Sequence, residues 1–89
     1  MAQAVVTIVN RLGLHARAAA KFVNLAKTFA SEVTLAKDGE AVDGKSIMSV
    51  MLLAAPVGTD IELVVAGSDE AEAFAALVEL VNDRFGEPD

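Results

Sequence analysis

Alternating apolar and polar positions and short β-branched runs predict four strands along the chain. The run Ala4–Val9 is short and rich in Val and Ile, and residues Glu32–Lys37 alternate Val and Leu with smaller or polar side chains. Both features are typical of strands. Asp38-Gly39 then predicts a two-residue hairpin turn, from which Glu40–Val42 returns as a short partner strand. The fourth predicted strand is Asp60–Ala66.

From Ala16 onward, the apolar residues recur with a helical period. Apolar positions on one side and basic or polar positions on the other predict an amphipathic helix with a basic outer face. The inward positions are Ala19, Phe22, Val23, Ala26 and Phe29, and the outward positions are Arg17, Lys21, Asn24 and Thr28.

A short second helix is predicted after the hairpin. Ser46 is a good N-cap, because its hydroxyl can accept a free backbone amide hydrogen at a helix start. The apolar run that follows predicts a helix to about Ala54, and Pro56 and Gly58 stop it.

The last third of the chain predicts a longer helix. Ser68-Asp69 is expected to cap it, and the helical period extends over about Glu70–Phe85. Gly86 and Pro88 are expected to end it. Its predicted buried stripe is Ala71, Phe74, Ala75, Val78, Val81 and Phe85.

The predicted order of elements is βαββαβα within one domain of residues 1–89. Such an order is typical of an α+β domain, and the simplest packing is an open-faced sandwich. In this fold one four-stranded antiparallel sheet carries all three helices on one face. The first helix is long enough to cross over to a non-adjacent strand, so the fourth strand is expected to fill the gap.

Charge and composition exclude several classes of site. The net charge of −6 argues against a nucleic-acid binder, and the lack of cysteine excludes disulfides and thiolate metal sites. A single histidine rules out a multi-histidine zinc site, and no cofactor is expected. Six of the seven Lys and Arg residues lie in residues 1–45, which indicates a basic face on an acidic protein. No targeting or membrane-spanning segment is recognisable, so the expected location is the cytoplasm.

The segment Gly13–Val23 holds the only histidine, next to the start of the first predicted helix. Free backbone N–H groups at a helix start favour an anion, and Arg17 adds a fixed positive charge within one turn. An imidazole beside such an anion site is suited to carrying a phosphoryl group, because its ring nitrogen is a nucleophile near neutral pH. The alternative is that His15 only caps the helix.

Two motifs resemble those of the HPr family, the phosphocarriers of the phosphoenolpyruvate-dependent phosphotransferase system. Residues 13–17 (GLHAR) resemble the family's active-site signature, and residues 44–51 (GKSIMSVM) resemble its motif around a regulatory serine. The length, the element order and the separation of the motifs also fit, so the resemblance covers the whole chain. Ala18 stands where many members have Pro, but Ala is a strong helix former and the helix should still begin here.

The resemblance implies a stoichiometric phosphoryl relay, not an enzyme with turnover of its own. His15 would accept a phosphoryl group on Nδ1 from the phosphohistidine of enzyme I and pass it to a histidine of an enzyme IIA domain. Arg17 and the backbone amide of Ala16 would steady the phosphoryl oxygens. A site this sparse and open stabilises its cargo only moderately, as a carrier requires.

Ser46 has two interpretations. It is expected to be the N-cap of the second helix. In the family, a serine in this motif is phosphorylated in many bacteria by an HPr kinase/phosphorylase, so the resemblance implies regulation at Ser46. A phosphate is locally favourable at a helix start, but it would add negative charge beside an apolar surface and weaken docking to enzyme I.

The second predicted helix is apolar on more sides than one buried face requires. Its surplus residues, Ile47, Met48 and Met51, are expected to be exposed and to meet several partners. The alternative is that both apolar stripes are buried in a small, Ala-rich core. The docking surface that the resemblance favours comprises Ala20, Lys21, Lys27, Lys45, Ile47, Met48 and Met51. The protein is expected to be a monomer.

Two further patterns are interpreted as structural. Gly39–Ser46 matches the phosphate-loop pattern G-x-x-x-x-G-K-[ST], but a hairpin explains the segment better. Its acidic residues would repel nucleotide phosphates. The chain is also too short for the large parallel sheet of phosphate-loop proteins. The acidic residues of the last helix are most simply a solvated face, with a carboxylate metal site as the alternative. These residues are Glu70, Glu72, Glu79 and Asp83.

Other functions stay open beside the general phosphocarrier. Within the family, the chain could serve the nitrogen-related branch and end on a regulatory IIA protein. In a different class, it could be a non-catalytic domain that binds a partner through the apolar second helix. A nucleotide hydrolase would depend on the phosphate-loop match, and we expect no nucleotide binding.

Overall fold

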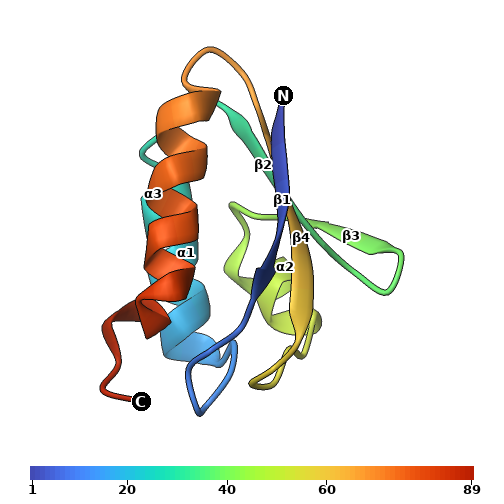
Figure 1. Cartoon of the computed structure of the whole chain (residues 1–89). Coiled ribbons are helices and arrows are strands. Elements are labelled where there is room, and N and C mark those ends of the chain that lie inside the picture. The colour runs from blue at the N-terminus through green and yellow to red at the C-terminus, as the bar shows by residue number, and fades with distance from the viewer.

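The computed structural model describes residues 1–89. Helices α1 and α3 lie side by side against the sheet, and the short α2 lies beyond them toward β3 (Figure 1). None of the helices combines the length and the apolar character that crossing a membrane requires. The elements are β1 (Ala2–Thr7), α1 (Ala16–Ala26), β2 (Glu32–Lys37), β3 (Glu40–Asp43), α2 (Ile47–Leu52), β4 (Asp60–Ala66), α3 (Glu70–Asn82) and the 3₁₀ turn η1 (Arg84–Gly86).

The sheet has the strand order β1-β4-β2-β3, and every neighbouring pair is antiparallel. β4 therefore lies between β1 and β2, as predicted, and the open-faced sandwich with the order βαββαβα is confirmed. The hairpin turn is also confirmed, because Asp38 and Gly39 have φ angles of 52° and 82°. Two successive left-handed residues match the twist of the strands that they join.

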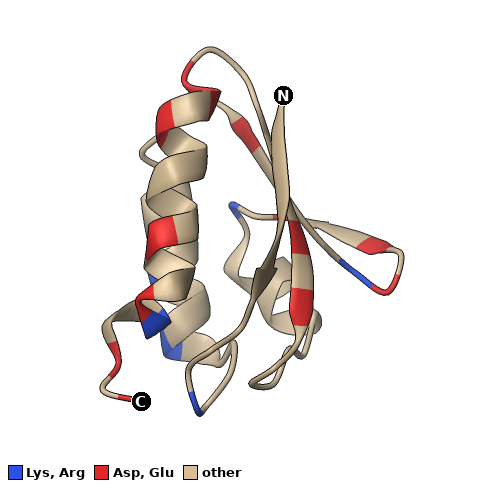
Figure 2. Ribbon diagram, in the orientation of Figure 1, with Lys and Arg blue, Asp and Glu red and all other residues tan.

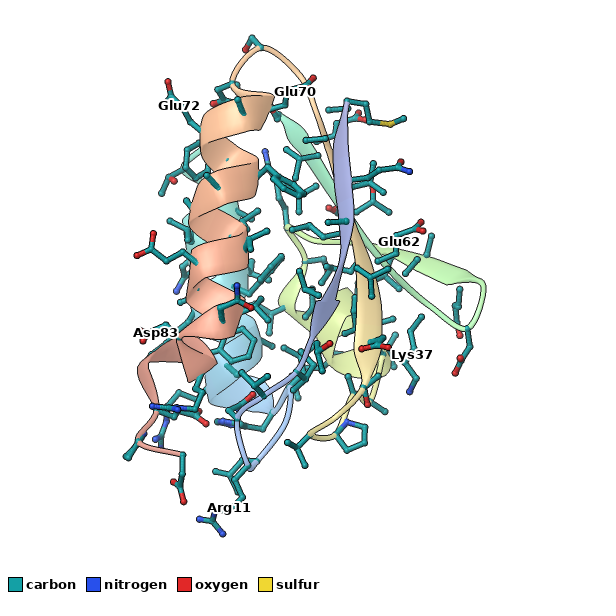
Figure 3. The ribbon with its side chains drawn as sticks, in the orientation of Figure 1. Arg11, Lys37, Glu62, Glu70, Glu72 and Asp83 are labelled. Atoms are coloured by element: carbon teal, nitrogen blue, oxygen red, sulfur yellow. The ribbon has the colours of Figure 1, made fainter.

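The sheet is buried on its helix-covered face and open on the other. In β4, Ile61, Leu63 and Val65 are buried, whereas Glu62 lies on the open face (Figure 3). This alternation follows the two-residue period of a strand. It fixes the register of β4, because a slip of one residue would expose the apolar set.

The helices complete the core with side chains of very different size. Ala18, Ala19 and Ala26 of α1 are fully buried, and such small side chains let α1 pack closely against its neighbours. Larger side chains fill the remaining space. The largest fully buried ones include Phe22, Phe85, Ile8, Ile61, Leu63 and Leu77.

The ends of two predicted elements differ from the structure. β1 begins and ends two residues earlier than Ala4–Val9, although Ile8 continues the pairing by donating to the Thr59 carbonyl (2.9 Å). α2 ends at Leu52 instead of Ala54, because Ala54 has a left-handed φ of 48°. There Lys37 Nζ donates to the carbonyl oxygens of Leu53 (2.8 Å) and Ala54 (3.2 Å), which would otherwise lack partners.

Two helices are shorter than their sequence patterns predict. α1 ends at Ala26, so Phe29 packs against the core from the following turn and not from the helix. α3 ends at Asn82 instead of Phe85, because Arg84 and Phe85 have left-handed φ angles of 57° and 54°. Such a backbone cannot continue a right-handed helix.

The buried stripe of α3 was partly mispredicted. Ala71 and Ala75 are exposed, whereas the fully buried positions of the helix are Ala73, Leu77 and Val81. The helix is apolar around most of its surface, so the helical period alone could not select the buried face.

The predicted cap of α3 is also different. Asp69 occupies the N-cap position but makes no side-chain cap hydrogen bond. Its carboxylate accepts instead from the Ser31 hydroxyl (2.5 Å), the Ser31 amide (2.9 Å) and the Ala30 amide (2.8 Å). These bonds, led by the one from the Ser31 hydroxyl, hold the pKa of Asp69 below its usual range. Asp69 therefore joins α3 to the loop before β2 instead of capping its own helix.

Candidate functional site

His15 lies at the N-cap of α1, as predicted. Its backbone is extended (φ −82°, ψ −179°), and its Nδ1 accepts the amide hydrogen of Arg17 at 3.3 Å. The first helical backbone bond runs from the Ala19 amide to the His15 carbonyl (2.8 Å), so the amides of Ala16, Arg17 and Ala18 precede it. Nδ1 therefore faces the electropositive start of the helix.

The loop before His15 is held against the segment that follows α2. Leu14 donates its amide hydrogen to the Ala55 carbonyl (2.8 Å). Gly13 has a left-handed φ of 73°, and a Cβ there would lie 2.7 Å from the Ala55 oxygen and 2.9 Å from Pro56 Cα. Only glycine fits this position. The contact fixes the His15 loop beside the α2 region.

A carboxylate that the sequence analysis missed completes the surroundings of His15. One oxygen of Glu87 contacts His15 Nε2, and the other accepts from Asn10 Nδ2 at 2.9 Å. The side chains of His15 and Glu87 are 27% and 9% exposed. The hydrogen bond from Asn10 and then the contact with His15 hold the pKa of Glu87 below its usual range. Glu87 is 72 residues from His15, so no local pattern could have indicated this contact.

Arg17 is exposed at the start of α1, and none of the three ion pairs of the protein involves it. Its positive charge helps to lower the pKa of Glu87, so it lies within electrostatic reach of that carboxylate. The site therefore offers an imidazole nitrogen, backbone amides and an uncommitted guanidinium. This arrangement can accept a phosphoryl group and stabilise its oxygens.

Ser46 caps α2, as predicted. Its Oγ accepts the amide hydrogen of Ser49 (3.3 Å), and its carbonyl accepts that of Val50 (2.9 Å). The residue is half-buried at the edge of the apolar surface formed by α2.

Most of α2 is exposed, and only Val50 is fully buried. The alternative that both apolar stripes are buried is therefore wrong. Leu52 was not among the predicted exposed residues but is the most exposed of the set. We call this set the α2 patch: Ile47 (37% exposed), Met48 (74%), Met51 (41%) and Leu52 (76%).

The lysines of the predicted docking surface, Lys21, Lys27 and Lys45, are placed differently from one another. Lys21 Nζ donates to the Phe85 carbonyl and Lys45 Nζ to the Phe29 carbonyl, both at 2.8 Å. Lys27 is exposed just after α1, and Ala20 is half-buried within the helix. Figure 2 shows acidic positions spread over α3 and β4 and basic positions near the His15 end of α1. Part of the positive charge thus lies near the candidate site, beside the acidic residues of the C-terminal segment.

Other candidate sites gain no support from the structure. Residues 39–46 form a hairpin turn, strand β3 and a second turn, so the phosphate-loop match is not a phosphate-binding loop. The acidic residues of α3, two of which are labelled in Figure 3 as Glu70 and Glu72, do not gather into a group of three metal-binding side chains. The two surface hollows lie on the sheet, away from His15.

Comparison with known proteins identifies the family. A family model described as the PTS HPr component phosphorylation site matches residues 2–83. The phosphocarrier protein HPr of Cupriavidus necator is 52% identical over 87 residues, covering 98% of each chain. HPr-C-His from Thermoanaerobacter tengcongensis has a TM-score of 0.96 and 43% identity, with full coverage of both chains (100%). An HPr dimer from the same organism has a TM-score of 0.79 and 44% identity, covering 98% of this chain and 100% of that one. The chain therefore belongs to the HPr family and is a phosphocarrier protein of the phosphotransferase system, not a catalytic enzyme.

Proposed function

We propose that His15 accepts a phosphoryl group on Nδ1 from the phosphohistidine of enzyme I and passes it to a histidine of an enzyme IIA domain. The observation that carries this proposal is the position of Nδ1 at the N-terminus of α1, next to the amides of Ala16 and Arg17. A helix start is a ready-made site for phosphoryl oxygens. We expect this relay to run in the cytoplasm, where phosphoenolpyruvate is formed.

The transfer exchanges one phosphorus–nitrogen bond for another. The Nδ1 lone pair of His15 attacks phosphorus, and the bond to the donor imidazole breaks with its electron pair returning to that ring. Arg17 and the amides of Ala16 and Arg17 stabilise the charge on the phosphoryl oxygens during the exchange. Because the site is open, the second transfer to enzyme IIA can proceed without a trapped intermediate.

The α2 patch is the proposed docking surface for both partners. Its exposed methionines adapt to more than one partner surface, and its place beside the His15 loop would bring a docked protein to Nδ1. Ala20, Lys21, Lys27 and Lys45 would surround it and favour acidic partners. The protein is proposed to dock as a monomer, and the HPr dimer of Thermoanaerobacter tengcongensis makes the oligomeric state in solution a necessary check.

Ser46 is proposed as the regulatory phosphorylation site for an HPr kinase/phosphorylase. A phosphate on its Oγ would stand at the start of α2, directly before Ile47 and Met48 of the α2 patch. Its negative charge is compatible with the helix start but would have to be desolvated in a docked complex. Phosphorylation would therefore weaken docking without unfolding the protein.

The relay is tested with enzyme I, Mg²⁺ and phosphoenolpyruvate, followed by mass spectrometry at mildly alkaline pH. We expect one added phosphate on the wild-type protein and on Ser46→Ala, and none on His15→Ala. The phosphate should be labile in acid, as a phosphorus–nitrogen bond is. No phosphate on folded wild-type protein, with an enzyme I that charges a known carrier, would refute the relay. If His15 is phosphorylated, transfer of the phosphoryl group to a set of IIA proteins will distinguish a sugar carrier from a carrier of the nitrogen-related branch.

The exposed α2 patch also supports a second candidate function, a non-catalytic domain that binds a partner through α2. In that case His15→Ala would leave partner binding and the cellular function intact. The relay predicts that the same variant keeps partner binding and loses all phosphoryl transfer.

A further inference from the structure

The segment after α3 turns back onto the loop that carries His15 (Figure 1). Arg84, Phe85 and Gly86 have φ angles of 57°, 54° and 77°. Successive left-handed residues are costly for side chains other than glycine and persist only where other contacts hold them. Phe85 is fully buried, and its carbonyl accepts a hydrogen bond from Lys21 Nζ. This anchored turn delivers Glu87 to His15.

Further contacts tie the same segment to the His15 loop. Asn10 Nδ2 donates to both the Glu87 carboxylate (2.9 Å) and the Gly13 carbonyl (2.7 Å). Arg11, labelled in Figure 3, donates its amide hydrogen to the Asp89 carbonyl (2.6 Å) and pairs its Nε with the Asp89 carboxylate (3.1 Å). The Glu87 carboxylate is thus held in place by the loop that ends in His15.

The two ring nitrogens of His15 have different partners. Nδ1 accepts the amide hydrogen of Arg17, so Nδ1 carries a lone pair. In the neutral ring the proton must then be on Nε2, which donates it to the Glu87 carboxylate. Because the lowered pKa of Glu87 keeps it ionised at neutral pH, it is an acceptor only. The nearly buried Glu87 side chain also covers Nε2.

We propose that Glu87 is a positioning residue that directs phosphorylation to Nδ1 of His15, by covering Nε2 and holding the ring proton on that atom. The proposal rests on His15 being the phosphoryl acceptor proposed above. Glu87 itself touches neither the phosphoryl group nor the donor. It acts through the imidazole, as the orienting carboxylate does in a serine-protease triad.

The proton count of the transfer is consistent with this role. The Nδ1 lone pair forms the bond to phosphorus while the bond from phosphorus to the donor nitrogen breaks. The Nε2 proton stays in place, so the His15 ring gains a positive charge when Nδ1 is phosphorylated. The Glu87 carboxylate neutralises that charge, and the ring loses it again when the phosphoryl group leaves. No additional base or reactant is required.

The test uses phosphoramidate, a small phosphoryl donor that needs no protein partner, and nitrogen NMR of the His15 ring. In the wild-type protein we expect Nε2 to carry the proton and nearly all phosphate to be on Nδ1. In Glu87→Ala we expect the share of Nε2-phosphohistidine to rise about tenfold, as loss of one charge-assisted hydrogen bond allows. Glu87→Asp should restore part of the preference for Nδ1. Glu79→Gln, which removes one carboxylate charge from an exposed position of α3, should leave the isomer ratio unchanged.

Unchanged isomer ratio and unchanged ring protonation in folded Glu87→Ala would overturn the proposal, and so would a proton on Nδ1 in the wild-type protein. An equal shift in Glu79→Gln would also overturn it, because the effect would then be one of overall charge. Amide NMR spectra confirm that each variant is folded. Since neither phosphoramidate nor the ring spectrum involves enzyme I, failure of the relay with enzyme I is distinguishable from failure of this proposal.

Discussion

Helices α1 and α2 each begin with a residue whose side chain accepts a backbone amide hydrogen, but in different surroundings. His15 Nδ1 accepts the Arg17 amide hydrogen and Ser46 Oγ accepts that of Ser49, both at 3.3 Å. α1 begins beside a free guanidinium and a carboxylate, whereas α2 begins a row of exposed apolar side chains. A helix cap therefore does not by itself define a chemical role. The groups around each cap separate the proposed transfer site from the proposed regulatory site.

The two helices also differ in how firmly they are packed. α1 has 11 residues, five of them buried, whereas α2 has six residues, of which only Val50 is buried. A firmly packed helix can hold a nucleophile in a defined position, because neighbouring side chains restrict its movement. An exposed apolar helix is instead suited to contact with partners. This comparison leads to four predictions, from the largest expected effect to the smallest.

Removing the guanidinium beside the α1 cap should have the largest effect. Arg17→Ala is expected to slow transfer from enzyme I by about a hundredfold, because one donor to the phosphoryl oxygens is lost. The initial rate of phosphate incorporation measures it. Arg11→Ala removes the same charge from an exposed ion pair and should change the rate by about twofold at most. Equal effects of the two variants would contradict a specific role for Arg17.

A negative charge at the α2 cap should have a smaller effect and act on docking. Aspartate is also a good N-cap, so Ser46→Asp keeps the cap while adding charge. We expect it to raise the KM of enzyme I for this protein about tenfold, with little change in kcat. Ser46→Asn, a neutral N-cap of similar shape, should keep the wild-type KM. A similar rise in Ser46→Asn would show that the shape of the side chain matters and not its charge.

Truncating the α2 patch should weaken docking by a few-fold. Met48 and Leu52 are 74% and 76% exposed, and their burial against a partner would contribute to binding. Met48→Ala or Leu52→Ala is expected to raise the same KM about threefold to tenfold. Val5→Ala is the matched control, since Val5 is 64% exposed on β1 in the sheet. An equal rise in the control would place the docking surface elsewhere.

The smallest effect concerns stability, and its pH dependence separates the carboxylate beside the α1 cap from the α2 cap. The pKa of Glu87 in the folded protein is below its ordinary value of 4.5. Its contribution to stability is therefore present above about pH 4.5 and is lost as pH falls through the folded value. Glu87→Gln should lower the free energy of unfolding by about 1 kcal/mol at pH 7 and by much less at pH 2. Ser46→Ala should cost about 1 kcal/mol at both values, because no titrating group is lost.

Urea unfolding at the two pH values measures these differences. The free energies of unfolding of Glu87→Gln and the wild-type protein should converge at pH 2, whereas that of Ser46→Ala should stay below both. A constant difference between Glu87→Gln and wild type at both pH values would show that the contact contributes no charge-dependent stability.

Much of the fold could be predicted because its signals are local. β2 and β4 have the predicted bounds, and the Asp38-Gly39 turn and the Ser46 cap are where the sequence indicates. Each of these depends on residues within a few positions of one another. The predictions failed where a distant contact competes with a local one. Asp69 is well placed to cap α3, but the amides and the hydroxyl 38 and 39 residues away hold its carboxylate.

The candidate site was predictable only in part. The sequence places His15 at a helix start beside Arg17, and that placement needs only the Gly-containing loop and the helical period. It also predicts exposure of Ile47, Met48 and Met51, because α2 is apolar on more sides than it can bury. The anchoring of Lys21 and Lys45 to backbone carbonyls could not be predicted, since those acceptors lie on other elements.

The sequence by itself determined the order of the elements, the hairpin and the two caps, because hydrogen bonds and side-chain periods between near neighbours specify them. Only the tertiary structure decided which face of α3 is buried and what surrounds His15. The carboxylate of Glu87 reaches His15 and Asn10 from 72 and 77 residues away. Packing of Phe85 and the strained turn around it bring the carboxylate there. Such contacts depend on how whole elements pack together, and no local pattern in the chain encodes them.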